Sequence, residues 1–523
     1  MTFFFILLSQ LIGAGSATAQ AASTNLSVSI SSGNISIQAG VAPSSPTATA
    51  ATAEPKEAPA PKKVKRSKPK RAAKAPAAKP AQAAAPKQAA PPADNSPYGL
   101  AMAAYEAKDY AKTVTLLKPL AENGMPQAQH FLAAMYYSGM GVAKDCMEAT
   151  NWYTTAAKQN YVKSQYTLGA LYYVGECVPQ NFEEAAQWYR KAAEQGSPEA
   201  QFSLGAMYAN GQAFAQSIKT AAKWYEKAAA QGDKLAQYNL GILYEQGQGV
   251  NRDYKEALHW LELAAKQNMA DAQYKVGYFY EQGLAVPADY AAASVWYNRA
   301  AEQGNALAQS RLGQMYNDGL VVKRDPSKAA AWHTKAAEQG TADSQYNLGM
   351  LYLKGEGKPK DAAKAIHWLE LAAAQKHPAA QTTLGELYYS GKGVKQDYVK
   401  AAELTLYPAE RGIADAQFNM GVMYAGGYGV TQDPMQAVYW YRKAAQQGHA
   451  GAQNNLGEYY YRGSGIQPNY LEACKWFTIA AAENEPNAKK SRDAIQKEMA
   501  QEQISRCQKD ANEEFKKIQS ARK

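Results

Sequence analysis

The feature that most restricts the fold of this chain is an internal repeat with a period of 36 residues. An Ala-Gln pair, or Ser-Gln in two copies, marks each of ten consecutive copies without insertion or deletion. The first residue of the pair is Ala128, Ser164, Ala200, Ala236, Ala272, Ala308, Ser344, Ala380, Ala416 or Ala452. A strict period of this length is typical of solenoids, in which each copy is one supersecondary unit that stacks on its neighbours.

Each copy contains two segments with helical periodicity. In the copy that begins at Ala236, apolar residues recur at helical spacing over residues 236–244 and again over residues 257–265. Gly247 and Gly249 lie between these segments and predict the end of the first helix. Gly241 lies inside the first helix, where glycine costs about 1 kcal/mol relative to alanine. We expect close approach of the neighbouring helix to explain this glycine.

These patterns predict an all-α fold, an α/α superhelical solenoid of ten 36-residue helix-turn-helix repeats over residues 128–487. Residues 95–127 contain a segment like a second helix, with Leu116 at the position of the repeated tryptophan, and predict an N-terminal capping half-repeat. Residues 488–523 lose the repeated glycine and tyrosine and become charged, so we expect a C-terminal capping helix there.

The first 94 residues have a different composition and no repeat. Residues 1–19 resemble a secretory signal peptide, because an apolar run over residues 3–15 is followed by Ala17-Thr18-Ala19, although no Lys or Arg precedes the run. In residues 20–40 apolar and polar residues alternate, which predicts two short strands around Ser32-Gly33-Asn34. Residues 41–94 are rich in Ala, Pro and Lys and predict a disordered linker.

Most of the positive charge lies in this N-terminal part. Eleven Lys and Arg residues and three acidic residues precede Tyr98, so the remainder of the chain carries about +2 of the net charge of +10. A nearly neutral solenoid is not expected to bind nucleic acid. The basic cluster over residues 62–71, from Lys62 to Arg71, is interpreted as part of a solvated linker or as a contact for an anionic envelope surface.

The repeat resembles a known family. The copy that starts at Ala236 reads A-Q-Y-N-L-G-x-L-Y-x-x-G-x-G-V-x-x-D-Y-x-x-A-x-x-W, which is similar to the Sel-one-like repeat (SLR), a relative of the tetratricopeptide repeat. The resemblance implies an α/α superhelix that acts as an adaptor or binding scaffold, often in bacterial envelopes. It does not imply one particular partner.

The resemblance to tetratricopeptide proteins also implies which residues line a concave groove. One set follows the Ala-Gln or Ser-Gln pair, and a second set lies further along the same helix. These candidate partner-binding residues are Tyr166, Phe202, Tyr238, Tyr274, Tyr346 and Phe418, and then Tyr137, Tyr173, Tyr389 and Tyr461. Tyrosine suits recognition surfaces because it offers a large contact area at low entropic cost. The alternative that these rings pack between helices stays open.

The four cysteines lie at matching levels of the predicted stack. We predict two disulfides, Cys146–Cys177 and Cys474–Cys507, as expected for a protein of an oxidising compartment. Some relatives carry a cysteine pair in every repeat and are described as handling β-lactams. This sequence departs from that pattern, which weakens the case for such an activity.

No motif for catalysis, a cofactor or a metal is evident. The chain lacks G-x-S-x-G, H-E-x-x-H and C-x-x-C, and His259 and His367 are interpreted as packing or surface residues. We therefore expect a secreted, periplasmic or envelope-associated scaffold that is not an enzyme and binds a protein or peptide. The alternatives are an envelope enzyme, such as a slow β-lactam or peptidoglycan hydrolase, and a protein that binds an anionic polymer through its basic tail.

The eighth copy departs from the others. Leu404 stands at the tryptophan position and Pro408 replaces the first alanine of an Ala-Ala pair. A proline inside a helix costs about 3 kcal/mol. The pattern predicts a hinge between residues 95–380 and 381–523, unless Pro408 lies close enough to the helix end to be tolerated.

Overall fold

The computed structural model describes residues 28–31, 34–37, 95–320 and 323–521. The expected signal peptide and the basic linker with its cluster from Lys62 to Arg71 lie outside the described residues. The chain divides into two compact units, with the boundary between Leu263 and Ala264.

Unit 1 contains a β-hairpin and the first helices. Strands β1 (Val28–Ser31) and β2 (Asn34–Ile37) pair antiparallel with Val28 opposite Ile37, at the place where the sequence predicts two strands. The helices are α2 (Pro97–Glu106), α3 (Tyr110–Glu122), α4 (Pro126–Ser138), α5 (Cys146–Lys158), α6 (Val162–Val174), α7 (Phe182–Glu194), α8 (Pro198–Asn210), α9 (Ile218–Ala230), α10 (Lys234–Gln246) and the start of α11 (Tyr254–Lys266).

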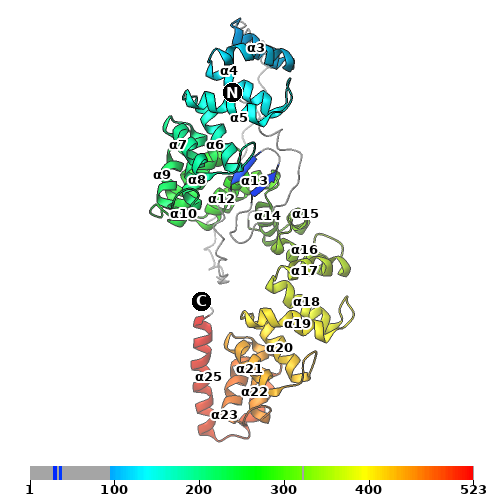
Figure 1. Ribbon diagram of the computed structural model, residues 1–523. Helices are drawn as coiled ribbons and strands as arrows, with labels where there is room; N and C mark the ends of the chain where they lie inside the picture. Colours follow the sequence, from blue (N-terminus) through cyan, green and yellow to red (C-terminus); the bar gives the residue numbers. More distant parts are fainter. Residues whose placement is uncertain (1–27, 32–33, 38–94, 321–322, 522–523) are drawn as a thin grey trace, which may run out of the picture. The chain divides into compact units, whose positions relative to one another are not determined.

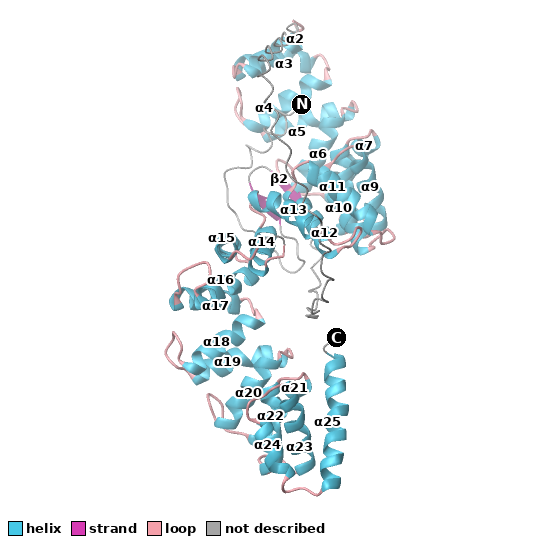
Figure 2. Cartoon of the chain, turned by 180° about the vertical axis from the view of Figure 1, so that it is seen from behind, coloured by secondary structure: helices cyan, strands magenta, loops and turns pink. Residues whose placement is uncertain are grey.

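Unit 2 continues the same series of helices. They are α12 (Ala270–Gln282), α13 (Tyr290–Glu302), α14 (Ala306–Asp318), α15 (Pro326–Glu338), α16 (Ala342–Lys354), α17 (Ala362–Ala374), α18 (Pro378–Ser390), α19 (Tyr398–Glu410), α20 (Ala414–Gly426), α21 (Pro434–Gln446), α22 (Ala450–Arg462), α23 (Tyr470–Ala482), α24 (Ala488–Gln496) and α25 (Gln501–Ala521). Within each unit successive helices pack against one another (Figure 1). The described chain is a helical solenoid, with β1 and β2 as its described strands (Figure 2).

Turn chemistry is the same in every repeat whose ends are described. The first helix ends at a left-handed glycine, such as Gly175 after α6, whose N–H donates to the carbonyl of Leu171. The second helix begins after an Asp, Asn or Ser whose side chain accepts from the first turn, as Asn181 does from the N–H of Glu184. These two signals fix where the first helix ends and where the second begins.

The helix-interior glycine has the cause that the sequence predicts. A Cβ on Gly241 would lie 2.7 Å from Cγ of Leu261 and 3.1 Å from the carbonyl oxygen of Ala257. Every heavier residue would therefore force α10 and α11 apart. The expectation of a close helix–helix approach at this glycine is confirmed.

A ladder of buried glutamines, not predicted from the sequence, connects successive repeats. Gln165 donates from Nε2 to the carbonyl of Ala157, while its Oε1 accepts from Nε2 of Gln195 at 2.7 Å. The same pair of bonds recurs in unit 2, for example at Gln309 with Gln339. Since a buried amide must be hydrogen-bonded to avoid a desolvation cost, the glutamine of the Ala-Gln pair has a structural role.

The eighth repeat breaks this ladder. Arg411 stands where the first seven repeats and the ninth have the second glutamine, and the buried Oε1 of Gln381 has no hydrogen-bond partner among the described residues. The tenth repeat, with Glu483 at this position, likewise leaves Oε1 of Gln453 without a partner there. Helix α19 nevertheless runs through Pro408 without interruption and has the 13-residue length of its counterparts. Pro408 lies two residues before its end. The fold thus shows no break inside the helix, while the hinge stays a prediction about dynamics.

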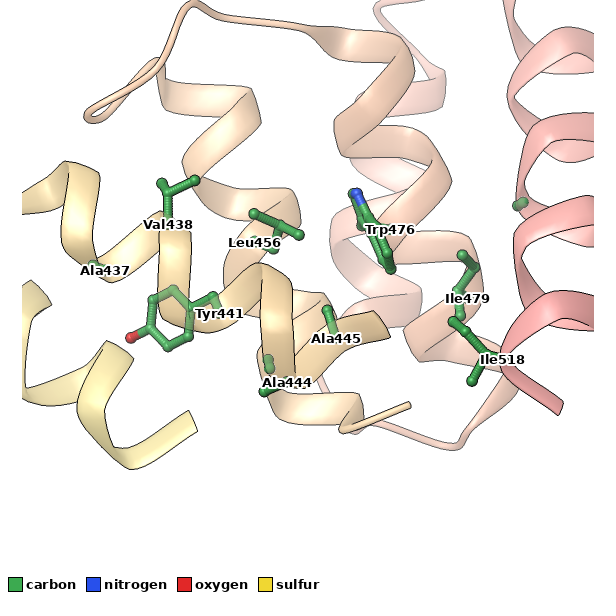
Figure 3. Packing of buried hydrophobic residues seen from close by; sticks show 11 residues of the cluster. Ala437, Val438, Tyr441, Ala444, Ala445, Leu456, Trp476, Ile479 and Ile518 are labelled. Atoms are coloured by element: carbon green, nitrogen blue, oxygen red, sulfur yellow. The ribbon is translucent and has the colours of Figure 1, made fainter. Parts of the chain in front are cut away.

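Both ends of the solenoid differ from the expected caps. Residues 95–127 hold two helices, α2 and α3, rather than a half-repeat, because Ser96 caps and Pro97 begins an additional helix. Residues 488–523 hold α24 and α25 rather than one helix. Helix α25 covers the last repeat, where Ile518 packs against Ile479 beside Trp476 (Figure 3).

Candidate protein-binding surface

The aromatic residues that follow the Ala-Gln pair contact the second helix of their own repeat. In unit 1, Tyr166 lies 5.7 Å from Tyr189 and Phe202 lies 5.6 Å from Tyr225, measured between ring centroids. Burial raises the pKa of Tyr166 to about 12. Phe202 is buried, whereas Tyr166 and Tyr238 are half-buried. One face of each ring therefore contributes to packing inside the repeat.

The corresponding rings of unit 2 are all half-buried. Tyr274 lies 5.6 Å from Tyr297, and Phe418 lies 6.0 Å from Tyr441. Two rings also stack on a histidine that caps the next first helix. These pairs are Tyr346 with His377 at 5.0 Å and Phe418 with His449 at 4.3 Å. His259 and His367 each contact the adjacent tryptophan instead.

The second predicted set has varied surroundings. Tyr137 is buried and lies 5.5 Å from Nζ of Lys144. Tyr173 is half-buried and donates its hydroxyl to Oε1 of Gln212. Tyr461 is exposed, and its hydroxyl donates to Glu498.

Tyr389 belongs to a cluster of three tyrosines. Its ring lies 5.4 Å from that of Tyr398 and 5.5 Å from that of Tyr428, and the latter two are 5.0 Å apart. Tyr428 is exposed, so the cluster presents aromatic surface to solvent.

Two pockets of unit 2, each lined by one predicted groove residue, share equivalent repeat positions. A pocket of about 140 Å³ between α14 and α16 includes Asn317 and Tyr346 in its lining. A pocket of about 190 Å³ between α18 and α20 includes Tyr389. When the lining of the first pocket is shifted by two repeats along the sequence, four of its positions coincide with lining positions of the second pocket. The pairs are Asn317 with Tyr389, Asn347 with Asn419, Met350 with Val422 and Leu351 with Met423. We call the surface formed by α14, α16, α18 and α20 the first-helix face.

The two asparagines on this face are held in the same way. Nδ2 of Asn347 donates to Oε1 of Gln314 at 3.3 Å, and Nδ2 of Asn419 donates to Oε1 of Glu386 at 3.1 Å. Gln314 and Glu386 are also equivalent positions of their repeats. The acceptor oxygen Oδ1 of each asparagine takes part in neither of these bonds, so it is available to an N–H donor of a ligand.

Two buried histidines were not predicted from the sequence. Nδ1 of His130 lies 2.9 Å from Oγ of Ser164, and Nδ1 of His333 lies 3.1 Å from Oγ of Ser344. Burial lowers the pKa of His130 to about 3 and that of His333 to about 4. Both rings are therefore neutral at pH 7. No group of three His, Cys, Asp or Glu side chains within the described part of the chain is arranged to hold a metal ion.

The structure contains the two predicted disulfides. Cys146 and Cys177 join the first two repeats with their Cα atoms 4.9 Å apart. Cys474 in α23 and Cys507 in α25 join the C-terminal cap to the last repeat with Cα atoms 5.9 Å apart. Among the described helices, none combines the length and apolar character needed to cross a membrane.

The chain is built of tandem pairs of 13-residue helices, and its first-helix face carries pockets. These features define a helical repeat protein of the scaffold class. The Sel1 repeat model matches ten consecutive segments, so the chain belongs to the Sel1 repeat family. The matched residues are 126–161, 162–197, 198–233, 234–269, 270–305, 306–341, 342–377, 378–407, 414–449 and 450–485. Proteins of this family generally act as protein–protein interaction scaffolds and are typically non-enzymatic.

Two solved structures are similar to this chain, and the first supports this assignment. A protective antigen of uropathogenic Escherichia coli with an SLR fold is 34% identical, with 78% of this chain and 96% of that chain covered and a TM-score of 0.53. A Sel1 repeat protein of Oxalobacter formigenes is 37% identical over 55% of this chain and 86% of that chain, with a TM-score of 0.45. The sequence has no match among curated proteins.

Proposed function

We propose that this protein is an exported scaffold that binds an extended peptide segment of a partner protein on the first-helix face of unit 2. The observation that carries the proposal is that two pockets, two repeats apart, share four equivalent lining positions. Each pocket also contains one tyrosine, Tyr346 or Tyr389, at different positions of the repeat. Pockets that recur at the same repeat positions suit a ligand that itself repeats along its length. An extended polypeptide is such a ligand, because its side chains recur at a fixed spacing.

The chemistry of the face also favours a peptide. Asn347 and Asn419 are oriented by their bonds to the preceding first helix, and an amide oxygen accepts readily from a backbone N–H. The tyrosines beside them supply apolar contact area with two rotatable side-chain bonds each, which limits the entropy lost on binding. Half-burial holds each ring in place while leaving part of it exposed to a ligand.

Export is the second part of the proposal. Two disulfides are expected in an oxidising compartment such as the periplasm or the cell envelope, and the sequence of residues 1–19 predicts a signal peptide. The basic segment with Lys62 to Arg71 then contacts an anionic envelope surface and keeps the solenoid at a distance from it. Deletion of residues 41–92 should abolish salt-sensitive retention on anionic vesicles and leave peptide binding unchanged. Loss of peptide binding in this deletion would refute the spacer role.

Peptide binding is tested by selection from a random peptide library on the immobilised mature protein, followed by calorimetry. We expect Tyr389→Ala and Asn419→Ala to weaken the selected peptides about tenfold each, the effect of losing roughly 1.4 kcal/mol. The matched control is Tyr439→Ala, which removes a 44% exposed tyrosine from the second helix α21. Equal affinities for the three variants and the wild type would show that peptides bind elsewhere. Failure to select any peptide would refute the proposed function.

A further inference from the structure

A cluster of three tyrosines adjoins the pocket between α18 and α20. The ring centroids of Tyr389, Tyr398 and Tyr428 lie 5.0, 5.4 and 5.5 Å from one another. Tyr389 also lines the pocket, so the cluster and the pocket form one continuous surface. Tyr428 is 36% exposed, and the other two tyrosines are half-buried. We call these three residues the tyrosine cluster.

Tyr428 has no aromatic counterpart in the other nine copies of the repeat. The equivalent residues are polar, charged or aliphatic, as in Gln212, Leu284 and Ser464. The backbone N–H of Tyr428 donates to the carbonyl of Met423, and Gln212 makes the equivalent bond in its own repeat. The turn therefore forms without an aromatic residue, and the fold alone gives no reason for a tyrosine here.

A second departure from the repeat makes room for the ring of Tyr428. Gly426 is the last residue of α20, whereas the other nine copies have a side chain at this position, such as Asn210 or Gln246. A Cβ on Gly426 would lie 2.6 Å from Cζ of Tyr428, so any other residue would displace the ring. Two paired departures in the ninth repeat thus place one exposed ring beside two half-buried rings.

The cluster presents aromatic faces and hydroxyl groups without a net charge. Within the described part of the chain, the hydroxyls of the three tyrosines are bonded to no other residue. The adjoining pocket contains two charged lining residues, Glu386 and Lys392, which have opposite signs. An acidic or a basic ligand segment would meet a like charge as well as an opposite one, so the surface favours an uncharged segment.

A proline-containing segment has the matching chemistry. Its pyrrolidine rings are rigid and apolar, and such segments bind in aromatic-lined grooves because their extended conformation is formed in advance. A polyproline II segment has no internal hydrogen bonds, so its carbonyls are free to accept from the tyrosine hydroxyls. Proline also lacks the N–H that would otherwise need an acceptor at the cluster.

We infer that the tyrosine cluster binds an uncharged, proline-containing segment of the peptide ligand, and that Tyr428 determines this preference. The inference rests on the proposed function, since it names the kind of peptide that the first-helix face binds. Asn419 lines the adjoining pocket and accepts from the N–H of a neighbouring ligand residue that is not proline. The ligand therefore combines a proline segment with at least one flanking residue that has an N–H.

The test uses two fluorescein-labelled, amidated heptapeptides on the full mature protein, followed by fluorescence anisotropy. One peptide has the sequence Ser-Pro-Pro-Ser-Pro-Pro-Ser, and the other has alanine at every proline position. We expect saturable binding of the proline peptide, which excess unlabelled proline peptide reverses. The alanine peptide should bind about tenfold more weakly.

Two variants and a matched control identify the site. Tyr428→Ala removes the ring, and Gly426→Ala keeps the ring but displaces it, so each should weaken the proline peptide about tenfold. Gly426→Ala should not lower the melting temperature, because alanine has the higher helix propensity. Weaker binding in this variant is therefore not a folding defect. Gln246→Ala changes the equivalent position of the fourth repeat and should leave binding unchanged.

The inference is overturned by the absence of saturable binding of the proline peptide or by equal binding of the alanine peptide. Unchanged affinity in Tyr428→Ala or in Gly426→Ala would also overturn it. Library-selected peptides that need Tyr389 and Asn419 but contain no proline would overturn it while leaving the proposed function in place. Failure to select any peptide refutes the proposed function itself, so the two failures are distinguishable.

Discussion

The imidazole of His333 lies against the hydroxyl of Ser344, with Nδ1 and Oγ 3.1 Å apart and both side chains buried. Ser344 is one of two places where serine replaces the alanine of the Ala-Gln pair, and the other, Ser164, faces His130 at 2.9 Å. Each exception to the repeat pattern thus accompanies a buried histidine. The serine supplies a hydrogen bond that alanine cannot make.

The His333–Ser344 pair predicts a specific loss of stability in acid. Burial lowers the pKa of His333 to about 4 in the folded state, below its value of about 6.5 in an unfolded chain. The unfolded state therefore takes up a proton first, so stability present above pH 6.5 is lost as the pH falls toward 4. The contribution approaches about 1.4 kcal/mol per pH unit in this window.

The double variant His333→Leu/Ser344→Ala reproduces the pairing of Leu369 with Ala380 and removes this titration. Hydrogen exchange of α15 and α16, followed from pH 7 to 4.5, should show a shallower loss of protection in the variant than in the wild type. Parallel pH profiles for the two proteins would mean that His333 does not titrate as its burial requires.

The broken glutamine ladder in the eighth repeat can be repaired. Arg411→Gln places a donor opposite the buried Oε1 of Gln381, as Gln447 does opposite Gln417 at 2.7 Å. Satisfying this acceptor should raise the free energy of local unfolding of α18–α20 by about 1 kcal/mol. Arg411→Ala removes the same side chain without supplying a donor. Hydrogen exchange of α18–α20 should therefore become slower in Arg411→Gln but not in Arg411→Ala. An equal slowing of exchange in both variants would contradict a stabilising role for the glutamine ladder.

Pro408 leaves one carbonyl of α19 without its usual helical donor. We predict faster amide exchange over residues 399–412 than over residues 437–448 in the matching helix α21, and slower exchange over residues 399–412 in Pro408→Ala. The measurement is peptide-resolved hydrogen exchange of the full chain. Equal protection in the two segments would show that the proline is tolerated because it lies close to the end of α19.

The disulfide between Cys474 and Cys507 closes a separation of 33 residues and holds α25 on the last repeat. Replacing both cysteines by alanine should lower the stability of this cap by about 3 kcal/mol. Exchange of the α25 amides should accelerate, whereas the Cys146/Cys177 double alanine variant should leave α25 unchanged. Unaltered protection of α25 in the first variant would indicate that Ile518 and its apolar neighbours hold the helix without the cross-link.

The elements with the strongest repeat signal could be predicted from the sequence. Gly241 was assigned to a close helix contact, and the phase of the repeat placed the four cysteines in the pairs that the structure contains. The additional helices α2 and α24 carry none of the repeated landmarks, although Ser96 and Pro97 form a helix-start signal that marks α2 in the sequence.

The site was only partly predictable for a different reason. Gln195 lies at an exposed helix end, where glutamine usually indicates a solvated surface, so its bond to Gln165 was signalled only by the recurrence of this glutamine every 36 residues. The pocket at His333 combines side chains from α14, α15 and α16, and such a combination depends on packing rather than on spacing in the chain. The position of Tyr346 and Tyr389 in pocket linings was compatible with their prediction as groove residues.

The most direct test of peptide binding on the first-helix face is site-specific photo-crosslinking. A photoreactive phenylalanine is placed at Tyr389 or, in a matched protein, at Tyr439 on the second helix α21, and each is irradiated with a selected peptide. The account predicts a crosslink from position 389 that excess unlabelled peptide suppresses, and none from position 439. A suppressible crosslink from position 439 with none from position 389 would contradict it.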